Sequence, residues 1–426
     1  PIVGGVMLRK VADVVDPLVP AGCDRLHVSD AGGLAAGDEV VVVSSQTPKW
    51  VAALGLADHW GERPVVLRFP RVIMAVRPDR REIVLNVPVT SRLDRAAGHA
   101  QAEVHVVTRD GRLRHVGLED VLCLSGYDRA KRGKGGYFID ENHPNYMFRF
   151  RGVRDGWIRR CVALFYSCGL VSTGGSQHLT VEDCAMLDGV STDTPVHHTG
   201  TRKYYFNSSG EMLLFQRCYA RYARHAFIGN GPFGGTVWLD CFSERDHLKS
   251  EWHQRWGHGH LFDNVCCEAQ IGLAGTRSPH GQKAAFAVAW NNLICNRRTY
   301  EVDLFVNRLP GRVQNYGVGN VLRGSGKVGT DGFGEVGRVE SSGRFVAPRS
   351  LYLAQLRERL GAQAVRAVAT QKQLDGPRGA VWMDLVETFA PLPVYADPGQ
   401  APWTGLETWV PTLAPPAAAA DGTAVP

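Results

Sequence analysis

Short apolar runs that end in a cysteine or an asparagine recur through the middle of the chain. They end at Cys161, Cys184, Cys218, Cys241, Asn264, Asn292 and Asn320, at intervals of 23, 34, 23, 23, 28 and 28 residues. Units of this length, built from β-prone runs between Gly and Asn turns, are typical of a solenoid. The longest interval indicates an inserted loop between residues 188 and 207.

The repeat predicts an all-β fold, a right-handed parallel β-helix in which each coil gives one short strand to each sheet. Equivalent positions of successive coils then form ladders, and the cysteines and asparagines form an inward ladder. Because free cysteine is among the most buried residue types, we interpret most of the ten cysteines as core residues and not as disulfides.

The residue before each ladder position is expected to face outward, because side chains alternate along a strand. These residues are Arg160, Asp183, Arg217, Asp240, Asp263 and Asn291. One interpretation is a solvated ladder of mixed charge. The other is that Asp240 and Asp263, one coil apart, lie near the ~5 Å separation of the paired carboxylates in retaining glycosidases.

The flanking segments have different patterns, which divide the chain at residues 1–100, 101–345 and 346–426. Strands at residues 36–43, 71–76 and 81–89, the last two joined by a hairpin, predict a small β-rich N-terminal module. A polar link at 96–103 leads to the first coils, near VHVV (104–107) and VGLEDVLCL (116–124). LYLAQLRERLG, capped by Ser350 and stopped by Gly361, predicts an amphipathic helix over the open end of the solenoid. A Pro- and Ala-rich extended tail follows from Ala390.

Composition narrows the class of protein. Hydrophobic residues make up 44% of the chain and charged residues 21%, and no window approaches the eighteen unbroken apolar residues that a membrane span needs. The formal charge of +6 favours an acidic partner, while the sequence contains no nucleic-acid-binding motif. We therefore expect neither a membrane nor a nucleic acid as partner.

Four stretches are dense in side chains that could carry chemistry, and we expect the last three to converge from neighbouring coils. They supply Asp140, Glu141 and His143; His197, His198, Arg202, Lys203, Tyr204 and Tyr205; Arg221, Arg224 and His225; and Glu251, His253, Arg255, Trp256 and His258. The spacing of His253, His258 and His260 matches no zinc pattern, so no metal site is predicted.

Structural roles are the alternative for several of these residues. Asp140 and Glu141 could end a turn, and His225 could be a core histidine. Trp252 and Trp256 could be core residues, although their rings could also stack on sugars.

Two of the stretches carry a family resemblance. HQRWGHGHLFDN and RYARHAF, together with the repeated coils, resemble the pectate-lyase-like right-handed β-helix superfamily, in particular a group of bacterial, usually exported proteins. The matching positions are His253, Arg255, Trp256, Leu261, Phe262, Asp263 and Asn264, with Arg224, His225 and Phe227. Ala226 stands where that pattern has Asp. The resemblance implies a secreted or periplasmic location and allows calcium, but no cluster of aspartates at binding-loop spacing supports a cofactor.

The leading hypothesis is an enzyme that cleaves an acidic polysaccharide by β-elimination, which needs a base and donors that stabilise an enolate. Arg224 and Arg255 would bind the carboxylate, His225 or His253 would be the base, and Tyr205 a possible acid. Arg202, Arg221, His143, Trp256, His258 and Asp263 would bind the substrate. Alternatives are a glycoside hydrolase using Glu141, Asp240, Glu251 or Asp263, a non-catalytic glycan-binding or tailspike-like protein, and a small-molecule tailoring enzyme.

Overall fold

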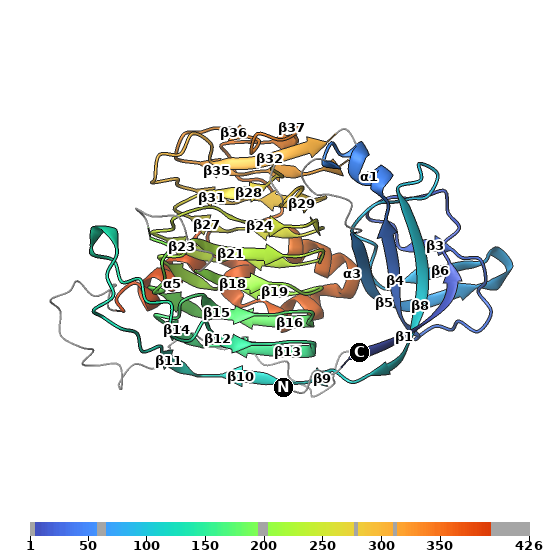
Figure 1. The fold of residues 1–426 in the computed structure, drawn as a ribbon, viewed down its shortest axis with the longest axis horizontal. Coiled ribbons are helices and arrows are strands. Elements are labelled where there is room, and N and C mark those ends of the chain that lie inside the picture. Colours follow the sequence, from blue (N-terminus) through green and yellow to red (C-terminus); the bar gives the residue numbers. More distant parts are fainter. Residues whose placement is uncertain (1–4, 58–64, 195–202, 277–279, 310–312, 393–426) are drawn as a thin grey trace.

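The computed structural model describes residues 5–57, 65–194, 203–276, 280–309 and 313–392. It is a stack of coils, a parallel β-helix, with an antiparallel sheet beside one edge and helices on its flank (Figure 1). The expected all-β solenoid, N-terminal β module and C-terminal helix are therefore confirmed.

Each coil contributes strands to three parallel sheets, here called sheets A, B and C. Sheet A contains β9 (Leu113–Arg114), β10 (Gly117–Glu119), β13 (Val153–Arg159), β16 (Gln177–Glu182), β19 (Leu214–Gln216), β22 (Val237–Leu239), β26 (Leu261–Asp263), β30 (Val288–Trp290), β34 (Tyr316–Val318) and β38 (Arg338–Glu340). Sheet B contains β11 (Leu122–Leu124), β14 (Val162–Leu164), β17 (Ala185–Leu187), β20 (Tyr219–Arg221), β23 (Phe242–Glu244), β27 (Cys266–Cys267), β31 (Leu293–Ile294) and β35 (Val321–Leu322).

Sheet C carries the candidate site. It contains β12 (Tyr146–Arg149), β15 (Gly169–Ser172), β18 (Tyr204–Ser208), β21 (His225–Asn230), β24 (Ser250–Gln254), β28 (Ile271–Leu273) and β32 (Leu304–Leu309), and β33 (Val313–Gln314), β36 (Val328–Gly329) and β37 (Glu335–Val336) pair with β32. A short pair, β25 (Gly257–His258) and β29 (Ala284–Ala285), lies between sheets C and A.

The interior ladder follows the prediction at six of its seven positions and differs by one residue at the other. Cys161, Cys184, Cys218 and Cys241 are buried, and the Asn292 side-chain amide bonds to Asn320 Oδ1 at 2.9 Å in the next coil. Between these two runs, however, β22 pairs with β26 so that Leu239 lies opposite Asp263. Val265, and not Asn264, therefore occupies the ladder position.

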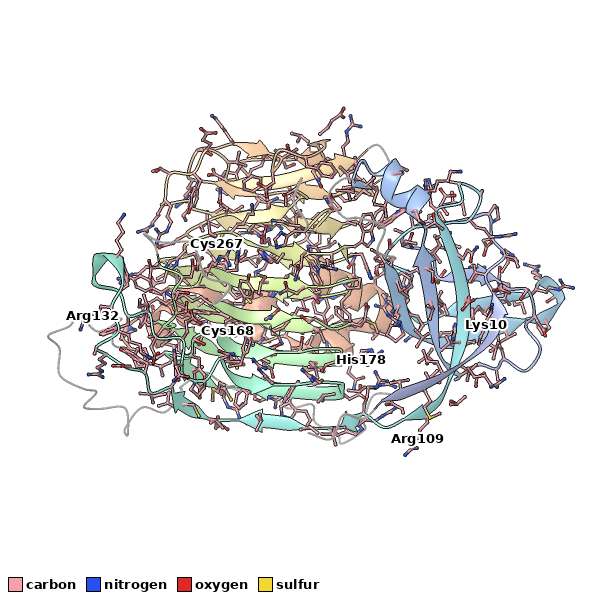
Figure 2. The ribbon with its side chains drawn as sticks, viewed as in Figure 1. Lys10, Arg109, Arg132, Cys168, His178 and Cys267 are labelled. Carbon is pink, nitrogen blue, oxygen red and sulfur yellow. The ribbon has the colours of Figure 1, made fainter. Side chains whose placement is uncertain are left out.

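The ten cysteines are free thiols, seven of them buried, which confirms that most are core residues. Cys168 and Cys267 lie within the coil stack (Figure 2). Small polarizable thiols allow close packing between coils only about 4.8 Å apart.

The residues before the ladder turn the chain, and apart from the half-buried Arg160 they are buried. Arg160, Asp183, Arg217, Asp240, Asn264 and Asn291 all have a φ between 49° and 55°, in the left-handed region. Asn264 and not Asp263 is thus equivalent to Asp240. Arg217 pairs with Asp183 at 2.6 Å, and Arg349 pairs with Asp240 at 2.6 Å. The chain after residue 345 covers the residues before the ladder from Asp183 to Asn291.

That segment forms α3 (Leu351–Val368), α4 (Gln371–Asp375) and α5 (Ala380–Phe389). The Ser350 side chain caps α3 as predicted, but the helix continues past a kink at Gly361, where φ is 82°. Leu353 packs against the outer face of sheet A and Phe389 against that of sheet B, so the helices cover the flank of the solenoid and not its open end. Among the described helices, none has both the length and the apolar character needed to cross a membrane.

The N-terminal module is a six-stranded antiparallel sheet in the order β1 (Val6–Asp13), β8 (Ala100–Asp110), β4 (Glu39–Gln46), β5 (Val66–Arg77), β6 (Glu82–Leu85), β3 (Arg25–His27). Its smaller elements are β2 (Leu18–Val19), β7 (Leu93–Asp94), α1 (Pro48–Ala53) and the 3₁₀ turn at Pro78–Arg80, whereas a second 3₁₀ turn, Lys134–Gly136, lies between β11 and β12 of the coils. The predicted β5–β6 hairpin is present. VHVV belongs to β8 of this sheet and not to the coils, whereas VGLEDVLCL forms β10 and β11.

Candidate active site

Polar and aromatic side chains gather on the outer side of three neighbouring strands of sheet C, β18, β21 and β24. Parallel pairing places Tyr204 opposite His225, and Ile228 opposite Glu251. The rings of Tyr204, His225 and His253 approach one another with centroid distances of 5.1 to 5.5 Å. This is the convergence that the sequence analysis expected of RYARHAF and SEWHQRW.

His253 joins two partners of different chemistry. Its Nδ1 lies 3.0 Å from Glu251 Oε1, and its Nε2 lies 3.3 Å from the Tyr204 hydroxyl. Because a carboxylate can only accept, Nδ1 carries the proton and Nε2 accepts from Tyr204. The result is a Tyr–His–Glu chain in which the carboxylate orients the imidazole, as the aspartate does in a serine-protease triad.

Glu251 is buried and remains ionised. Burial by itself would raise the pKa of Glu251, but Lys283 and Lys249 lower it well below its usual range. Lys283 Nζ lies 3.0 and 3.1 Å from the two carboxylate oxygens, and Lys249 Nζ lies 3.7 Å away. A carboxylate held in this way can orient a base but cannot donate a proton near neutral pH.

The Tyr204 hydroxyl also accepts a hydrogen bond from Arg224 Nη1 at 3.2 Å. Burial raises the pKa of Tyr204 to about 12, although Arg224 opposes the shift, so the phenol is protonated at neutral pH. On its other side, Arg224 Nε lies 3.9 Å from Asp193 Oδ2. Burial raises the pKa of Asp193 to about 6.

His225 forms the inner wall of the cluster and is 2% exposed. Its Nδ1 must donate to the Lys249 carbonyl, which leaves Nε2 as an acceptor without a hydrogen-bond partner among the described residues. Burial lowers the pKa of His225 well below its usual range. This imidazole is therefore neutral at pH 7.

The nitrogens of the two histidines and the Glu251 carboxylate lie within 4.8 Å of one another, a grouping that could ligate a metal ion. Two ammonium groups already neutralise that carboxylate, and a divalent cation would have to displace or outcompete them. The donor set therefore fits proton transfer better than metal binding. His253, His258 and His260 do not converge: His258 faces the N-terminal module, and His260 stacks on Trp252 in the core.

Two other predicted catalytic residues border the cluster. Arg255 is exposed just after β24, and its backbone N–H donates to the backbone carbonyl of His280, whose ring centroid lies 4.8 Å from that of His253. Glu141 Oε1 accepts two hydrogen bonds from Thr192, at 2.7 and 2.8 Å, in the segment that leads to the insertion. Arg202, His197 and His198 lie outside the described residues.

Tyr205 is not part of the site. Its side chain points into the core, its hydroxyl donates to the Tyr222 carbonyl at 3.0 Å, and burial raises its pKa well above the usual range. The next residue toward the N-terminus, Tyr204, takes the position that the sequence analysis gave to Tyr205. Tyr205 and its neighbour Phe206 both pack in the core, whereas Tyr204 is half-buried, so the first residue of β18 is the one that lies in the cluster.

The predicted substrate-binding residues are mostly structural. Trp256 packs edge-on against Trp50 at 4.4 Å, and His258 Nδ1 lies 2.7 Å from Thr90 Oγ1, both at the N-terminal module. Arg221 forms a buried ion pair with Asp188 at 2.6 Å. His143 bridges Ser125 and the Val190 carbonyl. Trp252 is a core residue.

The carboxylates of the hydrolase hypothesis are dispersed. Asp263 accepts from Ser350 and from the Tyr352 amide beneath α3, and Asp240 pairs with Arg349. Asp140 ends a turn, as the structural alternative held, with bonds from Lys131 and two backbone amides. Asp240 and Asp263 therefore anchor the C-terminal segment and do not face a substrate.

Sequence reasoning overlooked Lys249, Lys283, Asp193 and His280, which surround the cluster. Lys249 could have been found, because it lies two residues before Glu251 and so on the same side of the strand. Lys283 and His280 come from the next turn region, and no local pattern connects them to β24.

Comparison with known proteins gives a limited result. No protein-family model matches the sequence, and no curated protein matches it. Among solved structures, the chain is similar to the tailspike protein gp49 from Pseudomonas phage LKA1, with a TM-score of 0.42, 9% identity, and coverage of 74% of this chain and 46% of that one. The tailspike gp61 of Pseudomonas phage phi297 gives a TM-score of 0.33 at 12% identity, covering 79% and 63% of the two chains.

A third similar structure is the gp54 tailspike of Acinetobacter baumannii bacteriophage AP22, solved in complex with A. baumannii capsular saccharide. Its TM-score is 0.27 at 9% identity, and the match covers 80% of this chain and 61% of that one. The chain thus spans less than two thirds of the length of each of these tailspikes.

Proposed function

We propose that the protein cleaves an acidic polysaccharide by β-elimination on the outer face of sheet C. The observation that carries the proposal is the hydrogen-bonded chain Tyr204–His253–Glu251 beside Arg224. It combines an oriented base, a protonated phenol and a guanidinium in one cluster, which are the groups that elimination at a uronate requires.

The steps balance within the described residues. His253 Nε2 takes the C5 proton next to the uronate carboxylate, the C4–C5 double bond forms, and the C4–O bond breaks. Tyr204 gives its proton to the departing oxygen. The imidazolium then returns a proton to Tyr204 across the 3.3 Å hydrogen bond, which restores both groups. Because acid and base adjoin each other, the proton and the leaving group depart from the same face of the sugar.

Arg224 and Arg255 would stabilise the negative charge that develops on the uronate carboxylate during elimination. Arg224 lies at the Tyr204 hydroxyl and could pair with the uronate carboxylate as negative charge develops there. Glu251 keeps His253 oriented and stabilises the imidazolium, while Lys283 and Lys249 keep Glu251 ionised.

An acidic chain is favoured by a groove at the neighbouring corner between sheets B and C. It has a volume of about 460 Å³ and is lined by Tyr137, Tyr222, Arg245, Asp246, Glu268, Arg297 and Arg298. Arg245 lies over the Tyr222 ring at 5.6 Å. Arg297 pairs with Glu268 at 3.1 Å, and the remaining guanidinium groups, Arg245 and Arg298, with the two phenol rings suit carboxylated or sulfated sugars.

The experiment is incubation with a panel of polyuronates and neutral glycans, with ultraviolet absorbance of unsaturated uronates and reducing ends measured in parallel. We expect both signals to rise with at least one polyuronate. Reducing ends alone would contradict elimination and favour hydrolysis. Neither signal, together with saturable binding of a polyuronate, would replace catalysis with glycan recognition.

A glycoside hydrolase is the second candidate, and one observation favours it. Asp193 and Glu251 lie on opposite sides of the Arg224–Tyr204 pair, and Asp193 has the pKa of about 6 that a general acid needs. Asp193→Asn separates the two reactions, because it would abolish hydrolysis but leave elimination largely intact.

A further inference from the structure

A second cleft lies between the N-terminal sheet and the coils, with a volume of about 290 Å³. Strands β4 and β5 contribute Val40, Arg71 and Val72, and the coils contribute Glu211, Met212 and Phe233. Figure 2 shows His178, which also lines the cleft, at the edge of the coils that faces the N-terminal sheet. None of these residues belongs to the candidate active site.

Glu211 is the unusual group in this cleft. The residue is 6% exposed, and its Oε1 accepts from the Gly234 amide at 3.0 Å. Its Oε2 is buried and has no hydrogen-bond partner among the described residues. A buried polar atom of this kind destabilises the fold unless something pairs with it.

The charge state of Glu211 makes it a donor. Burial raises its pKa to about 8, against the opposing effect of Arg71. Because Oε1 already accepts from an N–H, the proton of the neutral carboxyl belongs on Oε2. Glu211 therefore offers an O–H group to the cleft at neutral pH.

Arg71 supplies positive charge at the same place. Its Nε, Nη1 and Nη2 donate to the carbonyls of Val87, Pro70 and Pro88 at 2.8 to 2.9 Å, which fixes the guanidinium. Within the described chain no carboxylate forms an ion pair with it. By contrast, Arg112 is paired with Asp110 and Arg154 with Glu39.

We propose that this cleft binds a small organic carboxylate with an apolar body. The ligand carboxylate would accept the Glu211 hydrogen bond in the field of Arg71, and its body would lie against Val40, Val72 and Phe233. Arg112 and Arg154 are neutralised by carboxylates and Arg68 is exposed to solvent, so an apolar molecule with a single anionic group fits better than a polyanion.

The test is calorimetric titration of the intact chain with octanoate and 3-phenylpropionate, and with the matching alcohols as controls for charge. We expect at least one acid to bind at a single saturable site, about tenfold or more tighter than its alcohol. Glu211→Gln keeps a donor and should stay within a few-fold of wild type. Glu211→Ala should lose about tenfold or more.

The pH dependence adds a second criterion. Affinity should fall as the pH rises through about 8, when Glu211 ionises and repels the ligand, and Glu211→Gln should abolish that fall. The other charged or titratable groups lining the cleft are Glu39, Arg68, Arg71, Arg112, Arg154 and His178, and the arginines keep their charge throughout.

Equal binding of acid and alcohol, or no binding of either acid, would overturn the proposal. If Glu211→Ala does not fold, Val72→Phe, which fills the cleft from its N-terminal wall, serves instead. It must abolish binding for the proposal to stand.

Discussion

The hydroxyl of Tyr204 lies 3.3 Å from Nε2 of His253, although the two residues come from strands β18 and β24, with β21 between them. Stacked coils place side chains from distant parts of the sequence at neighbouring positions of one sheet. The coil register thus creates the proton-transfer pair, and the hydrogen bond that His253 Nδ1 donates to Glu251 fixes which nitrogen of His253 can take part.

Tyr204→Phe removes the hydroxyl but keeps the ring between His225 and His253. We expect kcat on a cleavable polyuronate to fall by about 10² to 10⁴-fold, because the leaving oxygen loses its proton donor, with KM nearly unchanged. Steady-state kinetics measure this, with Tyr316→Phe on sheet A as the matched control. An unchanged kcat would exclude Tyr204 as the acid.

Arg217→Ala should destabilise the fold by about 3 to 5 kcal/mol, because it leaves the buried Asp183 without its arginine and removes one of the two arginines that pair with the buried Glu182. Arg217 also holds Gln373 of α4 at 2.6 Å, so amide exchange in α4 should become faster. Urea unfolding and hydrogen exchange check both effects. Arg338→Ala, which breaks an exposed pair with Glu340, should cost less than about 1 kcal/mol.

Asp263 should make stability depend on pH. Burial raises its folded-state pKa to about 7, above the usual 3.8, so its contribution is fully present below about pH 4 and is lost as the pH rises toward 7. The loss is at most about 4 kcal/mol at roughly 1.4 kcal/mol per unit. Asp263→Asn should therefore gain stability relative to wild type across that window in urea titrations, whereas the exposed Asp79→Asn should not. A constant difference between wild type and Asp263→Asn at every pH would contradict this.

The thiols should fall into two reactivity classes. Cys23, Cys123 and Cys295 are half-buried, and a hydrogen bond from Cys266 lowers the pKa of Cys295 to about 7, so Cys295 should react first with a thiol reagent at neutral pH. The seven buried thiols should react only in denaturant. Mass spectrometry of alkylated peptides distinguishes these outcomes, and early labelling of Cys218 or Cys241 would contradict the packing described here.

The repeat was readable from the sequence because the ladder cysteines and asparagines recur once per coil. The same approach misassigned Asn264 and Tyr205 by one residue each. Period-two alternation reverses the face at every step, and the turn residues that set the register carry no fixed sequence signature. The sequence pattern also could not predict long-range contacts. Nothing in HQRWGHGH indicates that the N-terminal module buries Trp256 and His258. The residues just before the ladder positions are mostly charged, which favoured an exposed row in the sequence analysis. Their charge therefore hid that α3 and α4 attach to this row.

The most direct measurement is the initial rate of unsaturated-uronate formation from a cleavable polyuronate by wild type, His253→Asn and His105→Asn. His105 lies in the N-terminal sheet, paired with Glu103, and serves as the control for a lost imidazole. If His253 is the base, wild type and His105→Asn should release the ultraviolet-absorbing product at similar rates. His253→Asn should release it more slowly by about 10² to 10⁴-fold. Equal rates for all three proteins would contradict the proposed site.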